Sequence, residues 1–238
     1  MVIEVLFPEL CNLYGDGANV RYLRACLPQA EFVETQNGQK PRFAQGKVDL
    51  LYLGSMAEPA QLLARDALLP YRQALRDYVD GGGAALVTGN AIELLGQELQ
   101  DGEAREKMLD LYPYCARRDL EARHNSMFLG RFGQTPIVGY KSQFSFLEGT
   151  FPPGLFHVVG GYGNGLKARD EGFRDGNLFA TYLLGPLLVL NPLFTKELLK
   201  LLGREESLPF EEDLMEAYRY RLAELSRPGV RFLMGEHG

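Results

Sequence analysis

Short hydrophobic runs alternate with helical patterns along the first hundred residues of this chain. Mostly apolar runs that end at turn residues predict four strands, at residues 2–7, 31–35, 48–53 and 84–88. Apolar residues spaced as on one face of a helix predict helices at residues 19–27 and 68–80, and a third helix begins at residue 90. Strands that alternate with helices through short loops indicate a parallel, doubly wound sheet.

The pattern changes at about residue 109, where the strand-like runs become short and closely spaced. We expect short strands at residues 126–129, 137–140 and 157–159, and we interpret them as an antiparallel extension of the sheet. A further strand at residues 178–182 and a helix at residues 194–202 then follow. The class predicted from this order is α/β.

Beyond Gly203 the chain has a polar linker and then an amphipathic helix over residues 209–225. Ser207 is a candidate N-cap, and three acidic residues at 211–213 favour the N-terminal end of the helix. Its apolar positions recur at helical spacing, at Leu214, Ala217, Tyr218, Leu222 and Leu225. An isolated helix of this length is marginal in water, so this face should be buried. It can pack on its own domain, or it can form a homo-oligomer or partner contact.

Composition and charge exclude several classes of function. The net charge of −6 and the pI near 5.2 argue against binding to nucleic acid or to an anionic membrane surface. Three cysteines are too few for a disulfide framework and favour a reducing, cytoplasmic location. Residues 178–194 carry no charge, but they are too short for a membrane span and contain two prolines. The apolar N-terminus has no basic region before it, so we interpret it as a strand and not a signal peptide.

The junction at residues 84–96 has the pattern of a nucleophile elbow: a buried strand, a tight turn and the start of a helix. In α/β enzymes of this kind the reactive Ser or Cys lies at the turn, and the amide after it helps to form the oxyanion hole. Here the turn position is Gly89, which has no side chain and cannot attack a carbonyl.

Four segments, in order, resemble the CobB/CobQ-like branch of the class I glutamine amidotransferases, and within it the glutaminase subunits of lipid II isoglutaminyl synthase (GatD). Residues 7–16 are similar to an N-terminal Leu-Asn-Leu-Tyr-Gly-Asp signature. Residues 48–55, which include Gly54 and Ser55, are similar to the strand that delivers a Gly-rich oxyanion loop. Residues 94–96 match the end of the elbow motif. Residues 161–192 carry Gly-Tyr-Gly-Asn, Glu-Gly, Thr-Tyr-Leu-Leu-Gly-Pro-Leu-Leu and Asn-Pro. They resemble the family's Gly-Tyr-Gly-Asn-Asn, Glu-Gly, Thr-Tyr-Leu-His-Gly-Pro-Leu-Leu and Asn-Pro.

The resemblance covers residues 1–203 and implies a three-layer α/β sandwich for that domain, followed by a second region, residues 204–238, with the linker and the C-terminal helix. It also implies that the catalytic positions are changed. The family's cysteine falls on Gly89, its histidine on Leu184 and a glutamine of the elbow on Glu93. In the family the histidine lowers the pKa of the thiol and carries its proton, which leucine cannot do. Residues 139–146 stand where the family has an arginine for the glutamine carboxylate, and they contain none.

These departures predict a vestigial pocket formed by Gly54, Ser55, Gly89, Asn90, Glu93 and Leu184, with no intact catalytic residue. The leading hypothesis is a non-catalytic binding or scaffolding subunit, and the resemblance implies as its partner a Mur-ligase-like amide synthase that amidates a peptidoglycan precursor. The alternatives are a residual amidotransferase and an enzyme whose site is rebuilt around Asn90, Glu93, Cys11 or a ligand. We expect structural roles for Cys26, Cys115, His124, His157 and the tail residue His237. No residues have the spacing of metal ligands, and we expect no cofactor.

Overall fold

The computed structural model describes residues 1–205 and 207–234. In these residues a six-stranded central sheet has the order β13-β14-β4-β3-β1-β2. Four strands confirm the predicted positions closely: β1 (Val2–Leu6), β2 (Glu31–Thr35), β3 (Leu50–Leu53) and β4 (Ala84–Thr88). They are parallel to one another and to β14 (Leu178–Thr181), whereas β13 (Phe173–Asp175) is antiparallel to β14.

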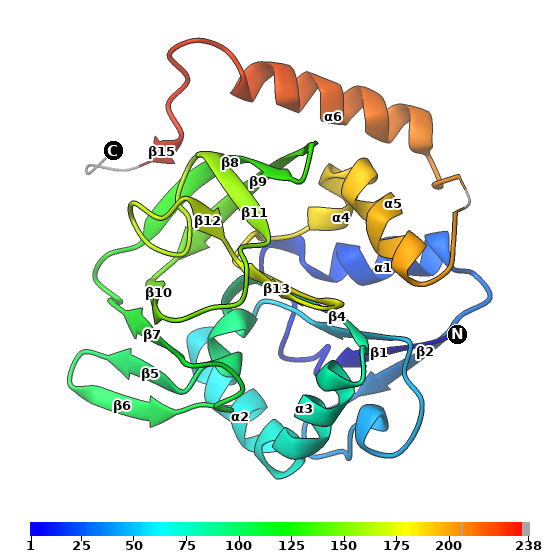
Figure 1. The fold of residues 1–238 in the computed structure, drawn as a ribbon, viewed down its shortest axis with the longest axis vertical. Helices are drawn as coiled ribbons and strands as arrows, with labels where there is room; N and C mark the ends of the chain where they lie inside the picture. Colours follow the sequence, from blue (N-terminus) through cyan, green and yellow to red (C-terminus); the bar gives the residue numbers. More distant parts are fainter. Residues whose placement is uncertain (206, 235–238) are drawn as a thin grey trace.

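Helices cover both faces of this sheet, which confirms the α/β sandwich (Figure 1). On one face lie α2 (Glu58–Leu68) and α3 (Arg72–Asp80), and on the other lie α1 (Gly17–Cys26), α4 (Leu187–Leu190) and α5 (Pro192–Leu201). Strand residues alternate between the two cores. In β3, Leu51 and Leu53 contact the α2/α3 side, while Leu50 and Tyr52 belong to the other core.

One helix was missed by the sequence reading, and one was placed too early. The residues 58–68 form α2, and the predicted helix at 68–80 is α3, which starts at Arg72 after a 3₁₀ turn over Leu69–Tyr71. Pro70 lies in that turn, and proline disrupts a continuous helix because it lacks an N–H. The predicted helix at 90–95 is instead a 3₁₀ segment, Gly89–Leu95.

The remaining strands form two smaller sheets rather than pairing at the edge of the central one. The first has the order β10-β7-β5-β6, formed by β5 (Glu98–Asp101), β6 (Ala104–Lys107), β7 (Tyr114–Arg118) and β10 (Ser145–Gly149). The second contains β8 (His124–Phe132), β9 (Thr135–Gln143), β11 (Phe156–Gly160), β12 (Asp170–Glu171) and β15 (Leu233–Met234). The strands expected in this region are present, but β8 and β9 pair with each other along their whole length. The antiparallel extension of the central sheet itself is β13.

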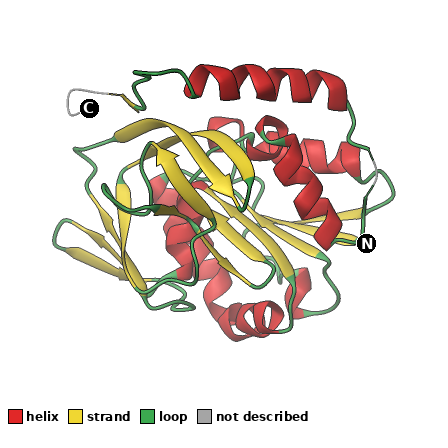
Figure 2. Ribbon diagram, turned by 45° about the horizontal axis from the view of Figure 1, so that its top comes forward, coloured by secondary structure: helices red, strands yellow, loops and turns green. Residues whose placement is uncertain are grey.

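Helix α6 (Glu211–Leu225) lies across the top of the molecule, against β9, α4 and α5 (Figure 2). Tyr218 and Leu225 are buried, and the Tyr218 hydroxyl donates a hydrogen bond to the Pro136 carbonyl at 2.8 Å. The apolar face of this helix is therefore covered by its own chain. The residue before the helix is Phe210, so the expectation of Ser207 as N-cap is wrong.

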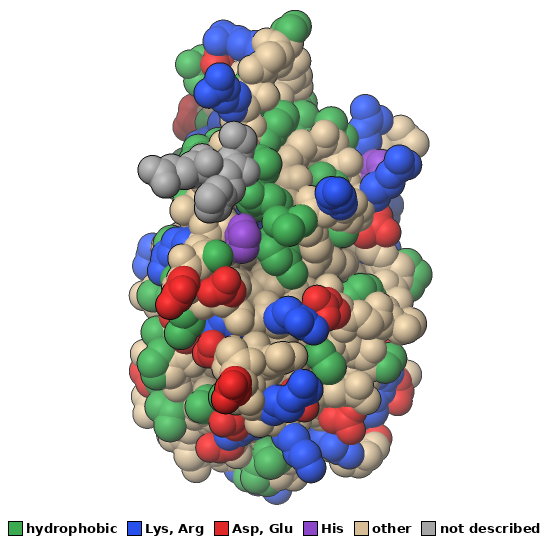
Figure 3. Space-filling model, turned by 90° about the vertical axis from the view of Figure 1, so that its left-hand side faces the viewer, with side chains coloured by type: hydrophobic (Ala, Val, Ile, Leu, Met, Phe, Trp, Pro, Cys, Tyr) green, Lys and Arg blue, Asp and Glu red, His purple; other side chains and the backbone are tan. Residues whose placement is uncertain are grey.

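Charged side chains of both signs are interspersed over the face formed by the smaller sheets, without a large basic area (Figure 3). Within the described residues, no helix is both long enough and apolar enough to cross a membrane.

Candidate functional site

The elbow follows β4, where the chain turns at Gly89 with a φ of +61°. This left-handed conformation is unfavourable for a residue with a side chain. A Cβ atom on Gly89 would lie 2.4 Å from the Cβ of Ser55 and 3.3 Å from Cδ2 of Leu184. The fold thus brings Gly89, Ser55 and Leu184 together, and the space that a side chain at position 89 would occupy is already filled.

The loop after β3 lies beside this turn, and its backbone amides are already hydrogen-bonded. The Ser55 N–H donates to Asp16 Oδ2 at 2.7 Å, and the Met56 N–H donates to Asn90 Oδ1 at 3.0 Å. The Asn90 side chain also donates back to the Met56 carbonyl at 2.8 Å. An oxyanion hole needs free donors aimed at the reacting oxygen. These two amides are engaged within the protein.

Asp16 is a buried carboxyl group that holds the elbow and the loop together. It accepts hydrogen bonds from the Thr88 hydroxyl at 2.7 Å and from the Asn19 amide at 2.9 Å, in addition to the Ser55 N–H. Burial raises the pKa of Asp16 above its ordinary value, although the hydrogen bonds from Thr88 and Ser55 oppose the shift. A Cβ on Gly54 would lie 2.6 Å from Asp16 Oδ2, so Gly54 allows this close contact.

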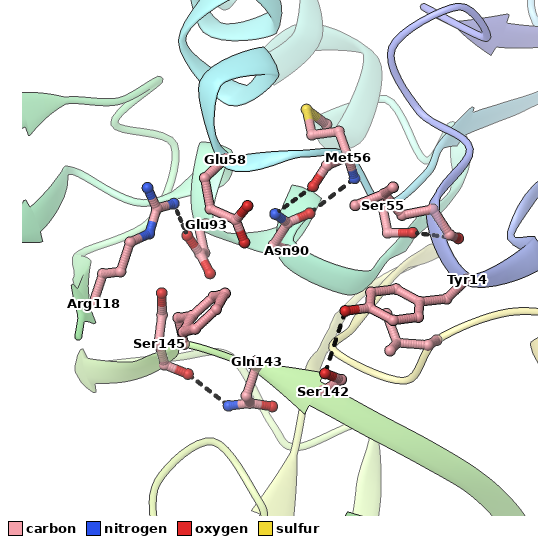
Figure 4. Close-up of a pocket in the computed structure, with 13 residues that line it drawn as sticks. Tyr14, Ser55, Met56, Glu58, Asn90, Glu93, Arg118, Ser142, Gln143 and Ser145 are labelled. Carbon is pink, nitrogen blue, oxygen red and sulfur yellow. Dashed lines mark hydrogen bonds and ion pairs between the residues drawn. The ribbon is translucent and has the colours of Figure 1, made fainter. Parts of the chain in front are cut away.

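A cleft opens in front of the elbow, between the central sheet and the smaller sheets (Figure 4). Ser55, Asn90, Glu93 and Leu184 line it, whereas Gly54 and Gly89 lie outside its lining. Its cavity volume is about 20 Å³, which is room for little more than one water-sized group. Its other lining residues are Leu13, Tyr14, Met56, Glu58, Arg118, Ser142, Gln143, Phe144 and Ser145.

Glu93 is buried at the back of the cleft and has a full set of partners. Its carboxylate accepts hydrogen bonds from Arg118 Nη2 at 2.9 Å, from Gln61 Nε2 at 3.0 Å and from the Tyr182 hydroxyl at 3.2 Å. A buried charge of this kind is tolerated when it is paired and hydrogen-bonded. The arrangement favours a structural ion pair over a role of Glu93 in a rebuilt active site.

Two arginines that the sequence reading missed lie at this cleft. Arg118 ends β7, where buried residues alternate at Tyr114, Ala116 and Arg118, so that its side chain points inward. Arg123 lies at the rim: its guanidinium donates to the Tyr14 hydroxyl at 2.6 Å and stacks 4.3 Å from the ring centroid of Phe144. The absence of arginine from residues 139–146 therefore does not leave the cleft without one. The alternating pattern at 114–118 is the signal that could have identified Arg118.

Among the described residues, no cysteine or histidine lines the cleft as a nucleophile or base. Cys11 is buried outside its lining, and burial raises the pKa of its thiol to about 12, so the thiolate needed for attack is not available near neutral pH. His124 packs against the rings of Phe146 and Tyr162, which also contact each other, and His157 is exposed beside Asp170. His237 lies outside the described residues. No group of His, Cys, Asp and Glu in residues 1–205 and 207–234 could hold a metal ion.

No protein-family model matches the chain. It is similar to the GatD subunit of the glutamine-hydrolysing lipid II isoglutaminyl synthase from Staphylococcus aureus, with 28% identity over 219 residues that cover 89% of this chain and 88% of that subunit. For GatD from Streptococcus pneumoniae the identity is 26% over 229 residues, covering 90% and 86%. A crystal structure of a glutamine amidotransferase aligns with a TM-score of 0.57 and 13% identity, covering 84% of this chain and 99% of that one. The fold is thus that of glutamine amidotransferases, and the sequence is homologous to GatD.

Proposed function

We propose that this chain is a non-catalytic, glutamine amidotransferase-like subunit that binds a Mur-ligase-like amide synthase in the amidation of cell-wall precursors in the cytoplasm. The two GatD relatives are named as subunits of a synthase, and their similarity extends over about nine-tenths of this chain. A subunit that has lost its own chemistry can keep the surface through which it binds its partner.

The structure of the elbow supports the part of the proposal that the chain is non-catalytic. A nucleophile at position 89 has no room beside Ser55, and Leu184, 3.3 Å from the Cβ that a residue at 89 would have, can neither accept nor donate a proton. The closeness of positions 89 and 184 supports their assignment to the family's cysteine and histidine. With both replaced, the nucleophile and the base are missing, and the Ser55 and Met56 amides of the neighbouring loop are engaged within the protein.

The competing hypothesis of a rebuilt active site finds less support. The Glu93 carboxylate accepts hydrogen bonds from Arg118, Gln61 and Tyr182. The Asn90 side chain accepts from the Met56 N–H and donates to the Met56 carbonyl. The raised pKa of Cys11 keeps its thiol protonated near neutral pH. None of these three groups is therefore free to act as a nucleophile or base in the cleft.

Reconstitution with a Mur-ligase-like synthase tests the proposal. The amide-forming activity of the synthase is measured with the chain present or absent, and with either glutamine or an ammonium salt as nitrogen source. We expect a stable complex in which ammonium supports amidation and glutamine does not. Amidation with glutamine would refute the non-catalytic role, and failure to form a complex would refute the assignment of the partner.

A further inference from the structure

A second pocket lies under the last turn of helix α6, where the helix does not close fully on the sheet below it. The pocket is bounded by that turn, by the strands β8, β9 and β11 and by Phe232 of the C-terminal tail. Its cavity volume is about 430 Å³, within the range of roughly 300–1,000 Å³ that is usual for small-molecule sites. No residue lines both this pocket and the elbow cleft, so it is a separate candidate site.

The C-terminal tail, residues 226–234, forms one wall of the pocket. After α6 the chain turns back to the sheet, where the Phe232 carbonyl accepts a hydrogen bond from the Met127 N–H at 2.9 Å and β15 pairs with β8 (Figure 1). The Phe232 ring lies against Gly160, where a Cβ would come within 2.4 Å of the ring. Glycine at position 160 therefore allows the ring to close the pocket on the side of β11.

The lining of the pocket is mostly apolar. Val159 is 54% exposed and lies where β11 changes its register with β8. An exposed apolar side chain that lines a hollow together with several others indicates a surface for an apolar ligand. The lining comes from four elements and the tail, and consists of Leu129, Gly130, Arg131, Pro136, Val159, Leu222, Leu225, Ser226 and Phe232.

Arg131 is the one charged side chain among the described residues that line the pocket. It follows Leu129 by two positions in β8 and lies opposite Pro136 of β9, so it shares a face of the sheet with the apolar lining. It is exposed, and no ion pair or side-chain hydrogen bond within residues 1–205 and 207–234 involves it. Its neighbour in β11 is His157, which faces the carboxylate of Asp170 at 3.8 Å. The guanidinium of Arg131 is therefore available to an anion.

An apolar hollow beside one available cation selects an amphipathic anion. A guanidinium binds a carboxylate or a phosphate through charge-assisted hydrogen bonds. A cationic amphiphile would meet Arg131 with a like charge, and a small polar anion would leave the apolar lining in contact with water. An anionic bilayer surface fits less well than a single molecule, because the net charge of the chain is −6.

We propose that the pocket under α6 binds a single-chain amphiphile with one anionic head group, a carboxylate or a phosphate monoester. The hydrocarbon chain lies among Leu129, Val159 and Leu222, and the head group binds the guanidinium of Arg131. Because α6 and the tail form two of the walls, a bound ligand favours their packing on the sheet. The site goes beyond the proposed function, since it uses no residue of the elbow and needs no partner.

The first experiment titrates the full chain with octanoate, octyl phosphate, octanol and octyltrimethylammonium, each below the concentration at which it forms micelles. NMR shifts of the methyl groups of Val159, Leu222 and Leu225 report both the location and the Kd. We expect both anions to shift these signals and to bind about tenfold more tightly than octanol. The tighter of the two anions identifies the head group. Unshifted methyl signals, or equal affinity for the cation and the anions, would overturn the proposal.

Two variants separate the head group from the chain. Arg131 and Val159 are exposed, so replacing either by glutamine should leave the fold intact. In Arg131→Gln the anions should bind no more tightly than octanol, and in Val159→Gln they should bind about fivefold more weakly than in wild type. Arg21→Gln and Leu63→Gln are the matched controls, because they remove an exposed arginine from α1 and an exposed leucine from α2. An unchanged Kd in both pocket variants would overturn the site.

The remaining outcomes identify a different occupant. Binding to vesicles of phosphatidylglycerol without binding to octyl phosphate would overturn the single-chain ligand in favour of a membrane surface. Loss of synthase binding in Val159→Gln, with no octyl compound bound by the wild type, would overturn it in favour of a partner protein. Failure of the wild type to bind a synthase would refute the proposed function, whereas binding of the octyl anions would still support this site.

Discussion

A methyl group added at Gly89 should be costly for two separable reasons. The first is the backbone: a residue with a Cβ at a φ of +61° loses about 1–2 kcal/mol relative to glycine. The second is the contact with Ser55 at 2.4 Å, which forces a shift in a well-packed region and costs about 1–3 kcal/mol more. We therefore expect Gly89→Ala to lower the free energy of unfolding by about 2–5 kcal/mol.

A double-mutant cycle with Ser55→Gly isolates the contact. Removing the Ser55 Cβ eliminates the 2.4 Å contact and leaves the Ser55 Cα and the Leu184 Cδ2 at 3.2 and 3.3 Å. Gly89→Ala should therefore cost less in that background, approaching the backbone part of about 1–2 kcal/mol. Gly133→Ala is the control for the backbone part alone, because Gly133 has a φ of +58° and nothing within 4 Å of its added Cβ. Urea unfolding of the variants, with the midpoint and slope fitted together, gives the free energies. An equal cost of Gly89→Ala in both backgrounds would refute the claim that Ser55 fills the nucleophile's space.

The remaining predictions concern the buried groups around the elbow. Arg118→Met should lower the free energy of unfolding by about 3–5 kcal/mol, because it leaves Glu93 buried without its cation, and adding Glu93→Gln should recover most of that loss in urea unfolding; a cost below about 1 kcal/mol would contradict the ion pair. Because burial raises the pKa of Asp16, the folded chain loses stability as pH rises from the unfolded pKa toward the folded one. Wild type should therefore lose stability relative to Asp16→Asn as the pH rises above about 4, the ordinary pKa of an aspartate in the unfolded chain, and a pH-independent difference in urea midpoints would exclude this. Gly89→Cys alone should release no ammonia from glutamine, since Leu184 supplies no base; turnover by this variant in a coupled ammonia assay would contradict the assignment of the two positions.

The central sheet could be predicted from the sequence because its strands are local patterns. Residues 31–35 and 84–88 are short strand-like runs that end at turn residues, and the structure places β2 and β4 at the same residues. The elbow was equally local, since the strand and the turn at Gly89 are adjacent in the chain. Pattern alone was sufficient for these parts.

The smaller sheets and the back of the cleft depend on contacts between distant residues, which periodicity does not report. The pairing of β5 with β7, parallel and within one small sheet, is set by packing and not by the strands' own composition. The arginine that pairs with Glu93 is 25 positions away in β7, and Gln143, at the end of β9, reaches the cleft only through the packing of the smaller sheets. The 3₁₀ segment Gly89–Leu95 leads into β5 where an apolar pattern predicted a helix.

The central claim is that this chain does not hydrolyse glutamine, and ammonia release measures that directly. Purified wild-type chain is incubated with glutamine, alone and with a Mur-ligase-like synthase, and ammonia is followed by a coupled enzymatic assay. We predict no release above the buffer control in either case. A turnover of about 1 s⁻¹ or more, as is usual for enzymes, would contradict it.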